Sequence, residues 1–402
     1  MYIKRTLEEG IKKLNNQFKV LLITGARQVG KSTLLKYCDK NRNYVTLDDY
    51  TQRETAINEP ELFLQKHKTP VIIDEIQYAP NLLSYIKMRV DNSDEKGNYW
   101  LTGSQQFHMM RNVTESLAGR VAVIDLKGLS LKEIDNTPQK PFIPTLDFIE
   151  QSRKTSKKYE LMDLYNIIWQ GSYPELTASK DKEWETFYKS YLQTYIERDI
   201  KDLNAVKNEM DFLKFLRVLA SRTGQMLNYT DIANEVGVAV TTIKSWVSVL
   251  VSSNIIYLLQ PYFNNLNKRI VKTPKMYFLD TGLCAYLTHW NNPRLLESGA
   301  MSGAFFETFI VSEIIKSYNH NTKEPNIYYY RDKEKREIDL IIEENGKLYP
   351  VEIKKSANPD KSAIKYFSII PDDRIGEGAV VCLAKDDFPM TKTVNIIPAG
   401  YI

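Results

Sequence analysis

The residues best suited to chemistry lie between positions 25 and 33, in the run GARQVGKST. Gly25, Gly30, Lys31 and Ser32 fit the spacing G-x-x-x-x-G-K-[ST] of a phosphate-binding loop, in which backbone N–H groups attract phosphates, the lysine bridges the β- and γ-phosphates and the serine hydroxyl binds Mg²⁺. A chance glycine-rich turn is the alternative, but the apolar strand before the loop and the helical pattern after it both agree with the motif. The residues expected to contact a nucleotide and its Mg²⁺ are Gly25, Ala26, Arg27, Gln28, Val29, Gly30, Lys31, Ser32 and Thr33.

Two adjacent acids follow the apolar run at 71–73 and give it the Walker B form. We expect Asp74 to hold the Mg²⁺ shell, directly or through water, and Glu75 to polarise the attacking water. Solvated acids at a strand end are the alternative, and the position behind a phosphate-binding loop favours the first interpretation.

Two further strands carry candidate residues at their ends. The run YWLT at 99–102 is expected to be buried, and ligands of open parallel sheets bind at the carboxyl ends of strands. Thr102 or Ser104 is therefore expected to sense the γ-phosphate. Arg120 directly precedes another apolar strand, at 121–126.

A second group of ionisable residues lies near the C-terminus. An Asn345–Gly346 turn is expected to join two strands into a hairpin. Asp339 lies on the first strand, while Glu352 and Lys354 are two residues apart on the second and face one side. Exposed strand charges are the alternative for any one of them.

The order of the N-terminal motifs resembles the AAA+ superfamily of ATPases, and GARQVGKST, DEIQ, LTGSQQ and SLAGR are similar to one prokaryotic group within it. The resemblance implies ATP and Mg²⁺ as ligands. It also implies that Arg120 reaches the nucleotide of a neighbouring subunit, which requires a homo-oligomer, and that the turn at 171–175 brings Gly171 and Pro174 to the adenine. An intramolecular salt bridge or helix cap for Arg120, and a simple helix–helix turn at 171–175, remain alternatives.

The C-terminal spacing D-x12-E-x-K resembles the PD-(D/E)xK nuclease core, and the resembled group of ATPases carries such a domain. That resemblance implies that Asp339 and Glu352 bind Mg²⁺ while Lys354 positions water, with Glu307 or, second, Glu313 as the helix acid. The sequence departs from the pattern by having Ile338 where the proline is expected. A nuclease-like fold without cleavage is the alternative, because function does not follow from fold.

From these motifs and patterns we expect an α/β protein with four parts. These are a P-loop (AAA+-like) core with a parallel sheet at 1–135, a helical lid at 136–205, a winged helix with a connector at 206–298, and a restriction-endonuclease-like α/β domain at 299–402. The proline- and lysine-rich stretch 132–158 is expected to be a domain boundary or an exposed connection. The stretch 303–318 is expected to form a strongly amphipathic helix.

In the winged helix, Thr230 is expected to cap a first helix and residues 240–252 to form a second. This second helix either enters DNA or, with more weight, serves a structural or protein-contact role, because its core-type residues outnumber its basic ones. The basic residues that could supplement either role are Lys268, Arg269, Lys272 and Lys275.

Composition sets the remaining limits. An apolar content of 43% suits an ordinary globular protein, and a net charge of +4 neither demands nor excludes nucleic acid. Three scattered cysteines give no disulfide framework or zinc site. The sequence has no secretion signal and no membrane-spanning run, so we expect a cytoplasmic protein. The expected function is an Mg²⁺-dependent ATPase whose cycle drives or gates a protein partner or DNA. An ATP-regulated nuclease or an ATP-binding switch without significant turnover is the alternative.

Overall fold

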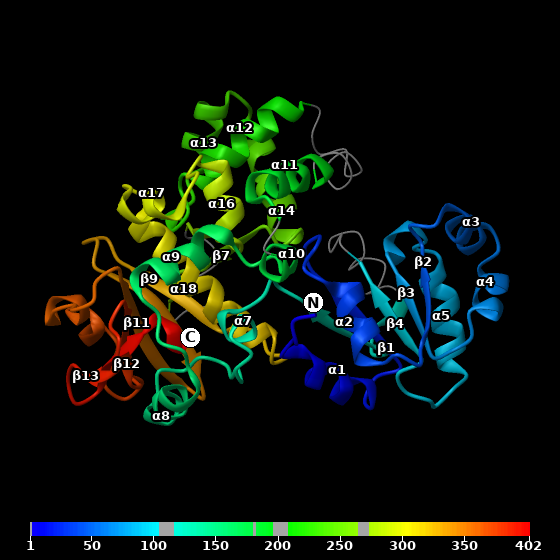
Figure 1. Ribbon diagram of the computed structural model, residues 1–402, viewed down its shortest axis with the longest axis horizontal. Coiled ribbons are helices and arrows are strands. Elements are labelled where there is room, and N and C mark those ends of the chain that lie inside the picture. The colour runs from blue at the N-terminus through cyan, green and yellow to red at the C-terminus, as the bar shows by residue number, and fades with distance from the viewer. Residues whose placement is uncertain (1, 104–115, 180–181, 196–207, 264–272) are drawn as a thin grey trace.

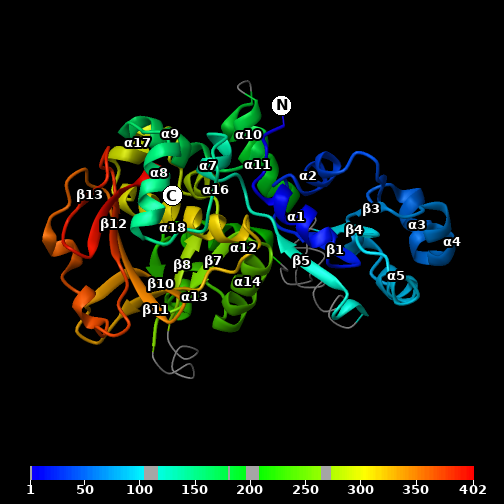
Figure 2. The same cartoon turned by 90° about the horizontal axis from the view of Figure 1, so that it is seen from below.

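The computed structural model describes residues 2–103, 116–179, 182–195, 208–263 and 273–402. Figure 1 shows the N-terminal domain on one side and the central helices and the C-terminal sheet on the other, with the segment around α7 between them. Figure 2, seen from below, shows α1, α10 and α11 at the junction of the two sides.

The N-terminal domain contains an all-parallel five-stranded sheet in the order β2-β3-β4-β1-β5. Its strands are apolar because both faces are covered. Along β1, Leu21 and Ile23 face a core shared with α1 and α2, while Val20 and Leu22 face a second core shared with α4 and α5. The strands are β1 (Val20–Thr24), β2 (Asn43–Thr46), β3 (Val71–Asp74), β4 (Tyr99–Thr102) and β5 (Val121–Asp125). The helices are α1 (Leu7–Asn15), α2 (Lys31–Cys38), α3 (Tyr50–Asn58), α4 (Pro60–Lys66), η1 (Ile76–Tyr78) and α5 (Leu82–Asp91).

The chain that leaves β5 is not the exposed connection expected at 132–158. It forms α7 (Leu131–Ile134) and α8 (Leu146–Thr155), and Leu131, Glu133 and Phe142 are buried. Helix α8 packs against the end of the chain, where the Ser152 hydroxyl donates a hydrogen bond to the carbonyl of Tyr401. Exposure was the wrong expectation for the buried part, because the proline and lysine content does not reveal that a distant part of the chain covers it. A domain boundary in this stretch stays a prediction. The residues expected to form one lid therefore lie partly on the C-terminal domain.

The central part is helical and includes a small antiparallel sheet in the order β6-β8-β7. Its helices are α9 (Leu161–Gln170), α10 (Pro174–Ala178), α11 (Trp184–Tyr195), α12 (Glu209–Ala220), α13 (Tyr229–Val236), α14 (Val240–Ser252), α16 (Thr281–Leu287) and α17 (Pro293–Ser298). Its strands are β6 (Gln225–Met226), β7 (Ile256–Leu259) and β8 (Lys275–Phe278).

The pair α13 and α14 lies where the helices of a winged helix are expected, at an angle of 106°. The N-terminal cap of α13 is Asn228, not Thr230 as expected, because the Asn228 side chain accepts the N–H groups of residues 230 and 231. In the described part of the chain, no single helix is long and apolar enough to cross a membrane. Helices α13 and α14 together have the length and composition of a membrane span, but the chain bends by 106° between them.

The C-terminal part is a mixed six-stranded sheet in the order β13-β14-β12-β11-β10-β9. Strands β10 and β11 form the expected hairpin, with Asn345 and Gly346 at positive φ in its turn. Strands β11, β12 and β14 run parallel. The elements are α18 (Ser302–Asn319), β9 (Ile327–Arg331), β10 (Glu337–Glu344), β11 (Lys347–Lys354), η3 (Lys361–Ile364), η4 (Phe367–Ile369), β12 (Gly378–Cys382), β13 (Phe388–Pro389), β14 (Val394–Pro398) and η5 (Ala399–Tyr401).

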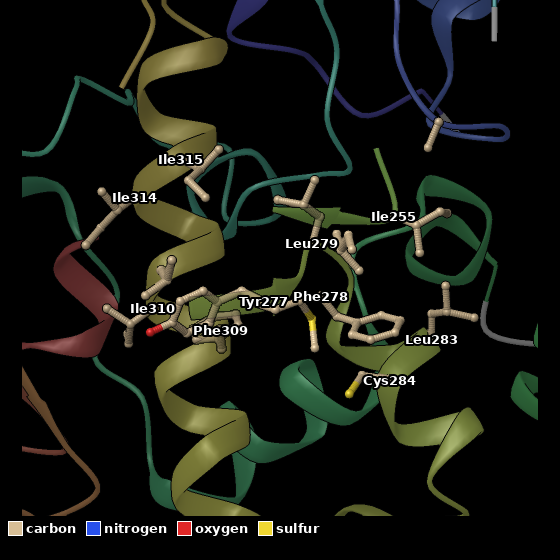
Figure 3. Packing of buried hydrophobic residues seen from close by; sticks show 14 of the residues in the cluster. Ile255, Tyr277, Phe278, Leu279, Leu283, Cys284, Phe309, Ile310, Ile314 and Ile315 are labelled. Atoms are coloured by element: carbon tan, nitrogen blue, oxygen red, sulfur yellow. The ribbon is translucent and has the colours of Figure 1, made fainter. Parts of the chain in front are cut away.

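Helix α18 is buried along most of its length, although its sequence was expected to present one polar face. Even Glu313, Lys316 and Ser317 are buried. The polar side is covered by the chain after β5. Another side packs on β8, as Figure 3 shows for Tyr277 beside Phe309 and Ile310. This helix therefore joins the central part to the C-terminal sheet.

Candidate functional site

The loop between β1 and α2 has the backbone shape that its glycines predicted. Gly25 has φ 141°, and a Cβ there would lie 2.2 Å from the carbonyl oxygen of Leu126. Gly30 has φ 93° and precedes α2, whose start has no side-chain cap. A helix start of this kind attracts phosphate oxygens, so the loop fits a nucleotide.

Lys31 lies inside the loop and is 6% exposed. Its Nζ donates hydrogen bonds to the carbonyl oxygens of Gly25, at 3.1 Å, and Ala26, at 2.9 Å. These acceptors hold the ammonium inside the loop, at the position where a phosphate-binding lysine is expected.

Asp74 lies at the carboxyl end of β3 and accepts hydrogen bonds from hydroxyl groups. Ser32 Oγ is 2.6 Å from Asp74 Oδ1, Tyr44 Oη is 2.8 Å from Oδ2, and the Thr102 hydroxyl also donates to Oδ1. Mg²⁺ commonly takes one or two protein oxygens together with phosphates, so the Ser32–Asp74 pair fits the ion. Tyr44 was not predicted. Burial and Asp74 raise the pKa of Tyr44, so its hydroxyl remains a donor.

Glu75 has a left-handed backbone with φ 58°. Its N–H donates to Thr102 Oγ1 at 3.1 Å, and the Gln77 amide donates to its carboxylate. A non-glycine residue in this conformation costs about 1–3 kcal/mol and is typical of functional sites. Thr102 thus contacts both acids of the Walker B motif, whereas Ser104 lies outside the described residues.

Arg120 lies at the opposite end of the strands from the loop. The residue precedes β5, which runs parallel to β1, so a strand length of about 15 Å separates Arg120 from the carboxyl ends. Its guanidinium pairs with Asp91 and donates to the carbonyl of Ala118. The intramolecular salt bridge left open by the sequence is therefore present. Arg120 is remote from the nucleotide site of its own chain, and its role toward a second subunit stays a prediction.

The turn at 171–175 lies beside the loop. Pro174 Cγ would be 3.8 Å from a Cβ placed on Gly30. Gly171 has φ 85°, and a Cβ there would lie 2.2 Å from the Tyr188 hydroxyl. Asp280, a residue that was not predicted, accepts hydrogen bonds from the Ser172 N–H at 2.6 Å and its hydroxyl at 2.8 Å.

Arg5 also was not predicted, and it ties the loop to the rest of the chain. It is 3% exposed, and its guanidinium donates to the carbonyl oxygens of Val29 at 2.9 Å and Lys127 at 2.8 Å. Its Nε lies 3.0 Å from Glu133 Oε2, and His320 Nδ1 lies 3.4 Å from Glu133 Oε1. Burial lowers the pKa of His320 to about 4, and Glu133 offsets this only in part.

In the C-terminal part, the structure brings Asp339, Glu352 and Lys354 together across β10 and β11. Lys354 Nζ lies 2.6 Å from Glu352 Oε2 and 3.4 Å from Asp339 Oδ2, which also accepts the Ile353 N–H at 3.0 Å. Burial and the neighbouring Asp339 raise the pKa of Glu352 to about 9. Burial opposes ionisation of Asp339 too, but Lys275 and the hydrogen bond with Glu352 hold the pKa of Asp339 below its usual value.

Glu307 is the helix acid of this group, whereas Glu313 points to the other end of α18 and accepts the Leu131 N–H at 2.7 Å. Lys275 lies 3.4 Å from Glu307, 2.5 Å from Glu337 and 4.0 Å from Asp339. Lys275 was expected to supplement either a DNA-facing or a structural role, and its exposure of 4% excludes the first and agrees with the second.

The three other basic residues of that expectation, Lys268, Arg269 and Lys272, lie outside the described residues. Among the residues that are described, no cluster of three or more histidine, cysteine, aspartate or glutamate side chains could hold a metal ion. The sequence gives no local signal for Arg5, Tyr44, Lys275 or Asp280, since each has its partners far along the chain.

Comparison with known proteins agrees with the motif at the N-terminus. Residues 17–135 match the family model described as "AAA domain". The N-terminal part is a P-loop ATPase domain of the AAA type. Residues 161–294 and 302–402 of the chain match two models described as domains of unknown function, DUF8612 and DUF4143.

Two relatives match the chain beyond this domain. The uncharacterized protein Rv2008c of Mycobacterium tuberculosis is 27% identical over 386 residues, which cover 95% of this chain and 80% of the relative. The uncharacterized protein MJ1637 of Methanocaldococcus jannaschii is 25% identical over 309 residues, which cover 68% of this chain and 63% of that protein. Among solved structures, the Walker-type ATPase PABY2304 of Pyrococcus abyssi has a TM-score of 0.42 at 16% identity, covering 70% of this chain and 94% of that one.

Proposed function

We propose that this protein is an Mg²⁺-dependent ATPase of AAA+ type whose cycle acts on a macromolecular partner through its C-terminal part. The observation that carries the proposal is the Ser32–Asp74 contact of 2.6 Å at the end of the phosphate-binding loop. In the proposed reaction, Lys31 pairs with the phosphates, Ser32 and Asp74 hold Mg²⁺, and Glu75 orients the attacking water.

Two variants and a matched control test this proposal. Lys31→Ala should lose tight ATP binding. Glu75→Gln should bind ATP but hydrolyse it about 10²- to 10⁴-fold more slowly, because it loses the group that orients water. Lys40→Ala, which removes an exposed lysine just after α2, should behave like wild type. Hydrolysis by Glu75→Gln at the wild-type rate contradicts the assignment, and tight binding without turnover in the wild type supports the switch instead.

The surroundings of the loop extend the proposal to a lid and to a second subunit. Pro174 lies beside Gly30, which supports a role for the turn at 171–175 in covering the adenine. Arg120 is half-exposed on an outer edge of the sheet, where a neighbouring subunit can approach it. We infer a homo-oligomer in which Arg120 acts on the nucleotide of the next subunit.

The residues of helix α14 favour a protein partner over DNA. Lys244 is the only basic residue of α14. The inward side of this helix consists of the buried residues Ile243, Trp246, Val247 and Leu250. A helix that reads DNA depends on several positive charges. The ATPase rate measured with and without DNA and RNA tests this inference, and stimulation by either nucleic acid would reverse it.

The second candidate function is cleavage of nucleic acid by the C-terminal domain. The pairing of Asp339 and Glu352 across neighbouring strands, with Lys354 2.6 Å from Glu352, favours it because metal-dependent phosphodiester cleavage uses such a group. Asp339→Ala should abolish Mg²⁺- or Mn²⁺-dependent cleavage while ATP hydrolysis stays intact. A wild type that cuts neither DNA nor RNA with either metal ion contradicts this candidate.

A further inference from the structure

Two side chains of the central part of the chain contact acidic residues of the C-terminal domain. These acids are Glu307, Glu337 and Asp339, and we call them the acidic group. Both of the side chains that contact them come from β8, which pairs with β6 and β7 and is not a strand of the C-terminal sheet. Lys275 and Tyr277 are two residues apart and therefore point to one side of β8. Figure 3 shows Tyr277 directed toward α18, the helix that carries Glu307.

Lys275 lies where carboxylates from two elements converge. Its Nζ is 2.5 Å from Glu337 Oε1, 3.4 Å from Glu307 Oε1 and 4.0 Å from Asp339 Oδ1. The side chain is 5% exposed. The Tyr277 hydroxyl donates to the same oxygen of Glu307 at 2.6 Å, so β8 supplies two donors to Oε1 of that carboxylate.

A divalent cation needs the oxygen atoms that these donors use. Mg²⁺ binds carboxylate oxygens at about 2.0–2.1 Å and takes several at once. Asp339 has one ammonium near each oxygen, Lys275 at Oδ1 and Lys354 at Oδ2. Glu307 has Lys275 and Tyr277 at its Oε1. The residues present therefore do not fit a divalent ion in this arrangement, in keeping with the absence of a metal-binding cluster among the described residues.

We propose that Lys275 is a built-in cation that closes the acidic site, and that a divalent ion binds there only after β8 has moved away. The geometry explains why a lysine outside the C-terminal sheet is buried among acids. A buried ammonium needs carboxylate partners, and carboxylates held this close need a cation. The inference concerns the acids of the second candidate function, and it stands whether or not they cut nucleic acid.

Binding of Mn²⁺ to the full chain without nucleotide tests the proposal, with electron paramagnetic resonance as the readout. Wild type should leave Mn²⁺ free at concentrations up to about 1 mM, a range in which weak carboxylate sites fill. Lys275→Met should bind one Mn²⁺, and adding Asp339→Asn should remove that binding. Adding Asp74→Asn should not, which separates the new ion from any ion at the phosphate-binding loop.

Folding is kept apart from metal binding by two further variants. Lys275→Met/Glu337→Gln removes one positive and one negative charge together, so the site opens without an unpaired buried acid. Lys316→Met is the matched control, because Lys316 is another buried lysine, paired with Glu313 at 2.7 Å outside this group. The control should not gain Mn²⁺. The proposal is overturned if wild type binds Mn²⁺ through Asp339, or if the folded double variant binds none.

Discussion

Two regions of the molecule hold buried aspartates, and they hold them differently. At the phosphate-binding loop, Asp74 accepts hydrogen bonds from three hydroxyl groups, and Lys31 is bonded to backbone carbonyls. In the C-terminal domain, Asp339 lies between the ammonium groups of Lys275 and Lys354. The first region surrounds its aspartate with hydroxyl groups, whereas the second surrounds it with ammonium groups.

The difference shows how much rearrangement each region needs before it binds a ligand. A hydrogen bond from a hydroxyl to a charged group contributes about 1.5–3 kcal/mol, and the hydroxyl of Ser32 can turn its lone pairs to a metal ion without moving the chain. Breaking a buried ion pair by removing one partner costs about 3–5 kcal/mol. The loop is thus organised for ligand entry, while the acidic group must first lose its lysine.

The largest expected effect separates the two aspartates directly. Asp74→Asn should lower Mg²⁺-dependent ATP turnover by about 10²- to 10³-fold, because a metal ion contributes several kcal/mol to charge stabilisation and loses a ligand here. Asp339→Asn should leave turnover unchanged, since its contacts are with Lys275, Lys354 and the Ile353 N–H. Steady-state phosphate release measures both. Equal losses in the two variants would show that the regions do not act separately.

The sequence was sufficient to predict the phosphate-binding loop. It was not sufficient to predict that Lys275 lies among the acids of the C-terminal domain. The chemistry of the loop follows from residues within one motif, and strand β3 adds Asp74 and Glu75 because parallel strands align their carboxyl ends. The pairing of Asp339 with Glu352 followed from a hairpin whose turn is visible in the sequence. Lys275 contacts Glu307 and Glu337 from 32 and 62 positions earlier, and no local pattern encodes that approach.

His320, Glu133 and Arg5 form a third buried group of ionisable residues, between the two regions. This group should make the free energy of unfolding depend on pH. The pKa of His320 is about 4 in the folded chain and about 6.5 when unfolded, so the unfolded chain binds more protons between these values. Stability should therefore fall as pH drops below about 6.5, by up to about 3 kcal/mol near pH 4. His320→Gln should lose less stability on acidification.

The measurement for His320 is the Tm of both proteins from pH 8 to pH 4.5. His67→Gln serves as the control, because His67 is only partly buried and lies in the AAA domain. The prediction is wrong if the Tm difference between wild type and His320→Gln stays constant with pH.

A smaller effect is expected at the turn 171–175, which contacts Gly30 of the loop through Pro174 and the N-cap residue of α16, Asp280, through Ser172. Gly171→Ala should destabilise the protein by about 1–3 kcal/mol, because φ is 85° and the added Cβ would meet the Tyr188 hydroxyl. Pro174 should then shift from Gly30, so the affinity for ATP should fall as well. Denaturant unfolding and a fluorescent ATP analogue report the two effects. Full ATP affinity in a destabilised variant would separate this turn from the nucleotide site.

The smallest structural effect is expected at Arg120. Arg120→Ala removes an exposed ion pair with Asp91, so the Tm should barely change. If Arg120 acts on a neighbouring subunit, turnover should fall while ATP affinity holds, and wild-type specific activity should rise with protein concentration. A monomer with full activity at all concentrations would leave Arg120 as a structural charge.

Helix α18 connects the two regions that these variants compare. Its 18 residues span about 27 Å, with Glu307 near one end and Glu313, Lys316 and His320 at the other, against the segment that Arg5 ties to the phosphate-binding loop. If nucleotide binding displaces this helix, binding free energies must be reciprocal. Whatever the C-terminal domain binds would change the affinity for ATP by the same factor by which ATP changes the affinity for that ligand. A ligand of unknown identity can thus be found through its effect on ATP affinity.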